Sequence, residues 1–231
     1  MQTKEITCPR CSRGNVIKHG ISAAGKQRYR CRRCGRQFII DYTRRGHDPA
    51  VRRLVVPLSL NGCGIRDIAR VLYLSTNTVL KLLRRHAAHV HKPRLPPHIT
   101  ELEIDEMWSF IGQKENQAWL WYAFEPRSKL IVAWLIGERT DRSCRLLLKQ
   151  LKSCQVLRFC TDEWGSYQKF IPWSQHWVGK QWTQDIERQN LNFRTHLKRL
   201  QRKTICFSKS RGMHEALIKL YIDHHNRQHH F

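Results

Sequence analysis

Acidic residues are scarce in this sequence of 231 residues: 18 Asp and Glu stand against 42 Lys and Arg, so the formal net charge is +24. This excess disfavours an ordinary neutral enzyme and favours a polyanionic partner such as a nucleic acid. Residues 1–98 carry 21 basic and 4 acidic residues, whereas residues 99–231 carry 21 and 14. The chain therefore divides into a strongly basic front half and a more balanced back half.

Long hydrophobic runs are also lacking. The longest apolar run, Leu130–Ile136, is too short to span a bilayer. The first thirty residues contain no hydrophobic stretch of the signal-peptide type. With 41% hydrophobic and 10% aromatic residues, the chain still has enough apolar side chains for a packed core. We therefore expect an intracellular, cytoplasmic protein with no membrane partner.

The nine cysteines do not suggest a disulfide framework, because their number is odd and four of them form two close pairs. The pairs are Cys8-Pro9-Arg10-Cys11 and Cys31-Arg32-Arg33-Cys34. Four thiolates at this spacing can close around one structural Zn²⁺, so residues 1–45 are predicted to form a zinc ribbon with strands at Lys18–Ile21 and Gln27–Arg30. A redox pair is the alternative.

Residues 46–91 have the pattern of a helix-turn-helix. A first helix is predicted within Asp48–Asn61, although Pro57 should kink or end it. Ser75 is predicted to be the N-cap of the last helix. The polar residues of that helix would face outward into a DNA groove, and they are Thr76, Asn77, Lys81, Arg84 and Arg85. An ordinary three-helix bundle without DNA binding is the alternative.

After a proline-containing linker at residues 92–98, the back half (99–231) alternates between extended and helical patterns. The expected elements are strands at Glu101–Phe110, Trp119–Phe124 and Lys129–Ile136, a helix at Asp141–Lys152 and a strand at Val156–Cys160. Turns are expected at Gly112–Asn116 and 126–128. This order predicts an α/β fold with a mixed sheet flanked by helices.

Three carboxylates are placed to converge on this scaffold. Asp105 lies within the first strand, and Asp162 follows the fourth. Glu187 lies in a predicted helix at Thr183–Leu200, on one face with Asn190, Arg194 and Lys198. Converging carboxylates repel one another unless divalent metal neutralises them, and two Mg²⁺ or Mn²⁺ ions could then act on a phosphodiester. The alternatives are a helix cap at Asp162 and an ion pair at Glu187.

Several motifs around these residues resemble the insertion sequence 1 transposase family. They are Ile104-Asp105-Glu106-Met107-Trp108, Thr161-Asp162-Glu163-Trp164, Ile186-Glu187-Arg188-Gln189-Asn190-Leu191-Asn192-Phe193-Arg194 and Lys203-Thr204-Ile205-Cys206-Phe207-Ser208-Lys209-Ser210. The resemblance covers nearly the whole chain. It implies an RNase H-like core in which Asp105, Asp162 and Glu187 are the metal-binding DDE triad. It also implies that Arg194 holds DNA near that triad.

The implied activity is that of a bacterial DNA transposase acting in the cytoplasm at the nucleoid. It would bind the terminal inverted repeats of an insertion sequence, hydrolyse the phosphodiester at each end, and join the 3′-hydroxyl to target DNA. A homodimer or higher oligomer on DNA is expected, since two ends must meet. The run Arg188–His214 contains eight basic and no acidic residues, and we interpret it as a DNA track that includes Asn190, Arg194 and Lys198.

Two further acidic residues, Glu106 and Glu163, adjoin the triad in the sequence. Strand parity points Glu106 away from Asp105, so it is the poorer metal ligand. Glu163 departs from the glycine expected after Asp162, and a turn could bring it inward. Two alternative functions stay open: a zinc-ribbon and helix-turn-helix transcriptional regulator without catalysis, and a metal-dependent nuclease without strand transfer.

Overall fold

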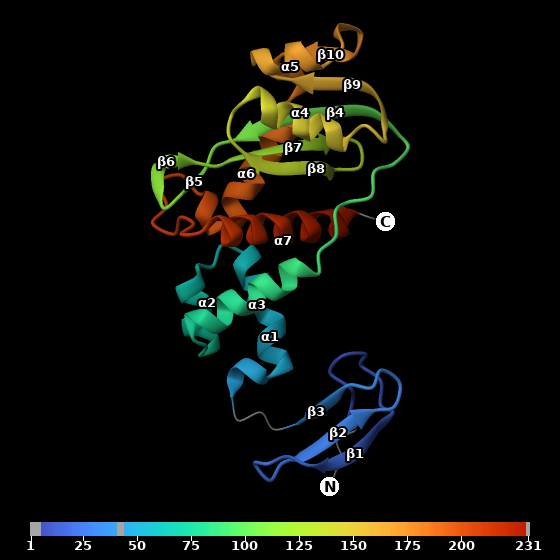
Figure 1. The fold of residues 1–231 in the computed structure, drawn as a ribbon, viewed down its shortest axis with the longest axis vertical. Coiled ribbons are helices and arrows are strands. Elements are labelled where there is room, and N and C mark those ends of the chain that lie inside the picture. The colour runs from blue at the N-terminus through green and yellow to red at the C-terminus, as the bar shows by residue number, and fades with distance from the viewer. Residues whose placement is uncertain (1–5, 41–43, 230–231) are drawn as a thin grey trace.

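The computed structural model describes residues 6–40 and 44–229. The predicted segments 1–45 and 99–231 include some residues outside these ranges. A small sheet lies at one end of the long axis, helices lie in the middle, and a larger sheet with its own helices lies at the other end (Figure 1). Within the described ranges, no helix has the length and hydropathy of a membrane span.

The N-terminal sheet has three antiparallel strands in the order β1 (Val16–Ile21), β2 (Gln27–Cys31) and β3 (Gln37–Ile39). The sequence pattern predicts the first two and misses the third. β3 is too short to show an alternating pattern, and it forms because buried Phe38 stacks on Tyr29 with ring centroids 5.9 Å apart.

The middle of the chain is helical. After η1 (Arg45–His47), α1 (Pro49–Leu60) begins at Asp48, whose carboxylate accepts a hydrogen bond from Ala50 N at 2.8 Å. Pro57 does not end the helix, as one form of the prediction had it, because α1 continues through Pro57 to Leu60. Pro57 lies in the last turn, where it removes one hydrogen bond, while buried residues on both sides keep the helix packed.

A tight turn joins α2 (Ile65–Leu72) to α3 (Thr76–Ala88). Tyr73 has the left-handed conformation, with φ 53° and ψ 46°, and ends α2. Ser75 then caps α3, since its Oγ accepts a hydrogen bond from Thr78 N at 3.1 Å. The predicted N-cap is therefore confirmed.

The large sheet has five strands in the order β10-β9-β4-β7-β8. Their bounds are β4 (His98–Met107), β7 (Trp119–Glu125), β8 (Leu130–Gly137), β9 (Gln155–Thr161) and β10 (His176–Val178). The first three in the chain form an antiparallel meander, and β9 and β10 add in parallel beside β4. The prediction of a mixed sheet in an RNase H-like α/β core is confirmed by this order.

A second hairpin replaces the predicted turn at Gly112–Asn116. β5 (Phe110–Ile111) and β6 (Gln113–Gln117) pair there and reverse direction at Gly112, whose φ is +77°. The first predicted strand accordingly ends at Met107 instead of Phe110.

Helices cover the two faces of the large sheet. They are α4 (Asp141–Gln150), α5 (Gly165–Phe170), α6 (Gln184–His196) and α7 (Arg211–His229), with single turns η2 (Trp173–Gln175), η3 (Lys180–Trp182) and η4 (Lys198–Leu200). One hydrophobic cluster joins α4 and α5 to the sheet, and the other joins the opposite face to α6 and α7. The cluster on the α6 and α7 side also contains buried side chains of α1, α2 and α3, and of these helices α1 and α3 pack against α7 (Figure 1). The helix-turn-helix and the sheet therefore share a core.

The predicted helix Thr183–Leu200 is too long. α6 ends at His196, and Leu197 is extended and buried. Beyond this point, Arg199 Nη1 donates hydrogen bonds to Ser208 Oγ at 2.9 Å and to Met213 O at 3.3 Å. Lys198 therefore does not lie on the α6 face that carries Glu187.

Candidate active site and DNA-binding residues

The four cysteines of the N-terminal sheet form one cluster. The Sγ atoms of Cys8 and Cys34 lie 3.6 Å apart, those of Cys11 and Cys31 lie 3.7 Å apart, and all four lie within 4.8 Å of one another. Thiolates bound at about 2.3 Å to a tetrahedral zinc ion are about 3.8 Å apart. The cluster therefore fits one structural zinc ion, as the spacing predicts.

The three predicted catalytic carboxylates come from three elements that meet beside β4. Asp105 lies on β4, and Asp162 directly follows β9. Because Glu103 pairs with Cys160 in this parallel ladder, the residues two positions further on, Asp105 and Asp162, come to the same level. Glu187 projects from the first turn of α6, which packs against β4.

The electrostatics of Asp105 reflect this convergence. Burial raises the pKa of Asp105 above its ordinary value, and the negative charges of Asp162 and Glu187 raise it further. A site where carboxylates oppose one another's ionisation favours a bound cation. Among the described residues, only the cysteine cluster brings three or more ligand atoms within 4.8 Å of one another, so the three carboxylates are more widely spaced than the thiols.

Asn190 lies one turn beyond Glu187 and contacts Asp105 directly. Its Nδ2 donates a hydrogen bond to Asp105 Oδ2 at 2.5 Å, and its Oδ1 accepts one from the Tyr122 hydroxyl at 2.9 Å. The residue is only 9% exposed. The expectation that Asn190 contacts DNA therefore needs correction, because both ends of its amide are engaged inside the protein.

Tyr122 and Glu103 are two residues that the sequence reasoning misses. Tyr122 pairs with Asp105 across β4 and β7, and its hydroxyl also lies 3.0 Å from Ile186 O. Glu103, two residues before Asp105 on the same strand face, accepts a hydrogen bond from Ile186 N at 2.6 Å. Desolvation raises the pKa of Glu103 to about 7. The sequence signal that could have identified Glu103 is its position two residues before Asp105, which places both acids on the same face of the strand.

Glu106 points to the opposite face of β4, as its parity predicts. Its carboxylate accepts hydrogen bonds from Arg139 Nε at 2.7 Å and from the Tyr167 hydroxyl at 2.5 Å. Burial raises the pKa of Glu106 to about 7. The Arg139 guanidinium also lies over the Trp164 ring, 4.9 Å from its centroid. Glu106 therefore anchors a side-chain cluster under the sheet, while Glu163 is exposed.

The predicted DNA-binding residues of α3 share one property: all are exposed. They are Thr76, Asn77, Lys81, Arg84 and Arg85. The apolar side of α3, including Val79 and Leu83, is buried. Of the predicted DNA contacts near the triad, Arg194 is half-buried and close enough to Asp105 and Tyr122 to interact electrostatically with both.

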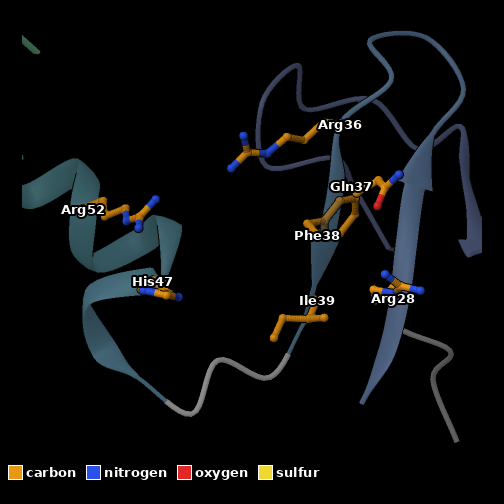
Figure 2. A pocket seen from close by; sticks show the side chains of 7 residues that line it. All are labelled: Arg28, Arg36, Gln37, Phe38, Ile39, His47 and Arg52. Carbon is orange, nitrogen blue, oxygen red and sulfur yellow. The ribbon is translucent and has the colours of Figure 1, made fainter. Parts of the chain in front are cut away.

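A basic concave surface lies between the N-terminal sheet and α1 (Figure 2). It has a volume of about 250 Å³ and is lined by Arg28, Arg36, Gln37, Phe38, Ile39, His47 and Arg52. The Arg52 guanidinium is held by a hydrogen bond from its Nε to Gly46 O at 2.6 Å. The described lining includes no acidic residue, so the surface suits an anion.

A mixed sheet with carboxylates beside two adjoining parallel strands and on a covering helix is the arrangement expected of a metal-dependent polynucleotidyl transferase of RNase H-like fold. Family models agree with this class. The model described as "IS1 transposase" matches residues 98–228, and those described as "InsA N-terminal domain" and "InsA C-terminal domain" match residues 1–35 and 42–86. The chain belongs to the IS1 transposase family, and its activity is that of a DDE transposase.

Individual relatives match about half of the chain. It is 47% identical over 123 residues to insertion element iso-IS1n protein InsB of Shigella dysenteriae, covering 53% of this chain and 94% of that protein. It is 40% identical over 121 residues to insertion element IS1 protein InsB of Shigella flexneri, covering 52% and 92%. The catalytic core domain of BIV integrase aligns with 51% of this chain and 80% of its own at 16% identity, with a TM-score of 0.32.

Proposed function

We propose that this chain binds the terminal inverted repeats of its insertion sequence, cleaves the phosphodiester at each end, and joins the resulting 3′-hydroxyl to target DNA. The observation that carries the proposal is the convergence of Asp105, Asp162 and Glu187 beside β4, where their charges act on one another. Three hard oxygen donors of this kind suit Mg²⁺ or Mn²⁺.

Asp105, Asp162 and Glu187 would together hold two divalent cations. When bound, such a pair activates the attacking oxygen and stabilises the leaving oxygen in an in-line displacement at phosphorus. Asn190 orients Asp105 by donating a hydrogen bond to its Oδ2. Arg194 holds a DNA phosphate beside the triad. Water attacks in the first step and the 3′-hydroxyl in the second, so one site serves both displacements.

End recognition belongs to the front half. We assign residues 1–45 to a zinc ribbon with one structural Zn²⁺ and 46–91 to the helix-turn-helix. The expected linker 92–98 is shortened to 92–97, because His98 begins β4, and the catalytic domain is assigned to residues 98–231. The exposed polar face of α3 enters the major groove of a terminal repeat. The basic surface in Figure 2 binds a backbone phosphate next to that groove. Lys198, in the back half of the chain, binds another backbone phosphate.

The working assembly is a homodimer or higher oligomer on DNA, acting at the bacterial nucleoid in the cytoplasm. Joining both element ends to one target requires two active sites in one complex. The net charge of +24 supports lasting association with DNA.

A strand-transfer assay with purified protein tests the proposal. Wild type is expected to nick labelled element ends and join them to target DNA in Mg²⁺ or Mn²⁺. Asp105→Ala should abolish both steps and keep binding to the ends, whereas Glu115→Ala, on the exposed hairpin strand β6, should keep both. Folded wild type that binds ends without metal-dependent cleavage would favour a regulator, and cleavage without joining would favour a nuclease.

A further inference from the structure

The N-terminus of α6, the helix that carries Glu187, has no side-chain cap of its own. Thr183 occupies the cap position with φ −126° and ψ 20°, and its side chain makes no capping hydrogen bond. The first N–H groups of a helix have no partner within the helix, and leaving them unpaired in a buried place is costly. The α6 N-terminus therefore needs an acceptor from elsewhere in the chain.

Glu103 on β4 provides that acceptor. Its Oε2 accepts a hydrogen bond from Ile186 N, in the first turn of α6, at 2.6 Å. Glu103 is 4% exposed, although no cationic side chain within residues 6–40 and 44–229 donates a hydrogen bond to it. A carboxylate at a helix N-terminus is stabilised by the unpaired N–H groups and by the helix dipole. Glu103 thus provides the acceptor that the Ile186 N–H lacks within the helix, and the helix end provides a donor to the buried carboxyl group.

We propose that Glu103 is a positioning residue that sets the location of Glu187 relative to Asp105. This proposal rests on the proposed function of the triad. Glu103 lies two residues before Asp105 on the same strand face, and its bonding partner Ile186 directly precedes Glu187. One strand therefore carries one catalytic carboxylate and fixes the helix that carries another.

A second contact strengthens the same connection one turn later, where Asn190 bonds Asp105. The two hydrogen bonds fix both the position and the rotation of α6 over β4. The remaining ion pair at this helix end, between Lys129 and Asp185 at 2.8 Å, is about half-exposed and contributes little to rigidity. The buried contacts therefore determine the spacing of the carboxylates.

The test compares Glu103→Leu, which lacks an acceptor, with Glu103→Gln, which keeps a neutral acceptor. The matched control is Glu101→Leu, because Glu101 lies on the same strand face and pairs with Arg158 at 3.0 Å, away from α6. Full-length protein is used throughout. The measurements are Mn²⁺ affinity by calorimetry, exchange protection of the Ile186 amide by NMR, and kcat and KM for cleavage of an element end.

Glu103→Leu should lose Ile186 protection, bind Mn²⁺ about 10-fold more weakly and lower kcat by about 10- to 100-fold, because small displacements of reacting groups have effects of this size. KM for DNA should stay unchanged. Glu103→Gln should retain Ile186 protection and recover Mn²⁺ affinity and kcat to within about threefold of wild type, as expected when the acceptor is kept. Glu101→Leu should match wild type in all three measurements.

Two results would overturn the proposal. In one, Glu103→Leu loses Ile186 protection yet matches Glu101→Leu in Mn²⁺ affinity and kcat. In the other, Glu103→Gln keeps Ile186 protection but loses Mn²⁺ binding as fully as Asp105→Ala, which would make Glu103 a ligand. The comparison of Glu103→Gln with Asp105→Ala does not involve Glu103→Leu. It therefore still tests the proposal if Glu103→Leu does not fold. Failure of the proposed function is distinct, since wild type itself would then show no metal-dependent cleavage.

Discussion

The Tyr122 hydroxyl offers a sharp test of how Asp105 is held. It lies 2.9 Å from Asn190 Oδ1 and 3.0 Å from Ile186 O, and the Asn190 amide in turn donates to Asp105. In Tyr122→Phe the ring still fills its buried space, but Asn190 Oδ1 loses its donor. The amide is then held only by its bond to Asp105, so the orientation of both side chains is less fixed.

The expected magnitude follows from burial. Tyr122 is fully buried, and a buried acceptor left without a partner costs about 1–3 kcal/mol. A loss of about 2 kcal/mol lowers the Tm of a chain of this size by about 4–8 °C. Loss of orientation at Asp105 should also reduce kcat by about 10-fold. Affinity for the element end should be unchanged, because the α3 surface is not altered.

Calorimetric unfolding and the cleavage assay measure these effects, with Tyr221→Phe as the matched control. Tyr221 is also a buried tyrosine, but within the described part of the chain its hydroxyl has a single, long hydrogen bond, which it accepts from Gln189 Nε2 at 3.5 Å. The control should change Tm and kcat little. If Tyr122→Phe and Tyr221→Phe behave alike, the hydroxyl does not hold Asn190 and the reasoning is refuted.

Two further predictions concern other parts of the molecule. Burial lowers the pKa of His214 to about 4. Between pH 6.5 and 4, the His214 imidazole is protonated in the unfolded chain but stays neutral in the folded chain. Protonation therefore favours unfolding, and the free energy of unfolding should fall by about 3 kcal/mol as the pH is lowered towards 4. In urea unfolding, the free energy of unfolding of His214→Gln should depend less steeply on pH than that of wild type. Equal pH dependence in the two proteins would contradict this prediction. Zinc removal, or Cys31→Ser, should unfold the N-terminal sheet and weaken end binding, because its core contains little besides Cys8, Cys31 and Phe38. The rest of the chain should still unfold in its own thermal transition. If zinc removal abolishes the thermal transition of the whole chain, the N-terminal sheet does not fold independently of the rest.

Much of the fold can be predicted from local patterns. The alternation around Asp105, the apolar run at Leu130–Ile136 and the cap at Ser75 each correspond to an observed element, because each depends on neighbours within a few residues. Predictions fail where distant contacts decide the backbone. After the early end of α6, buried Leu197 and the contact of Arg199 with Ser208 hold the chain, and the short strand β3 accompanies the packing of Phe38 on Tyr29.

The candidate site divides in the same way. Asp105, Asp162 and Glu187 can be nominated from motifs, since motifs preserve residue types and spacing. The assignment of Asn190 to DNA fails, because the direction of its side chain depends on Asp105 and Tyr122. Neither contact has a signature in the local sequence.

By itself, the sequence determined the charge of +24, the two cysteine pairs, the alternating strands and the identity of the three acids. Only the tertiary structure decided that helices α1 to α3 share a core with α7, and that Glu103 caps the helix carrying Glu187. The physical reason is the range of the interactions. The bonds from Ile186 to Glu103 and from Asn190 to Asp105 span 83 and 85 residues. Such contacts exist only after the sheet and its covering helix have packed.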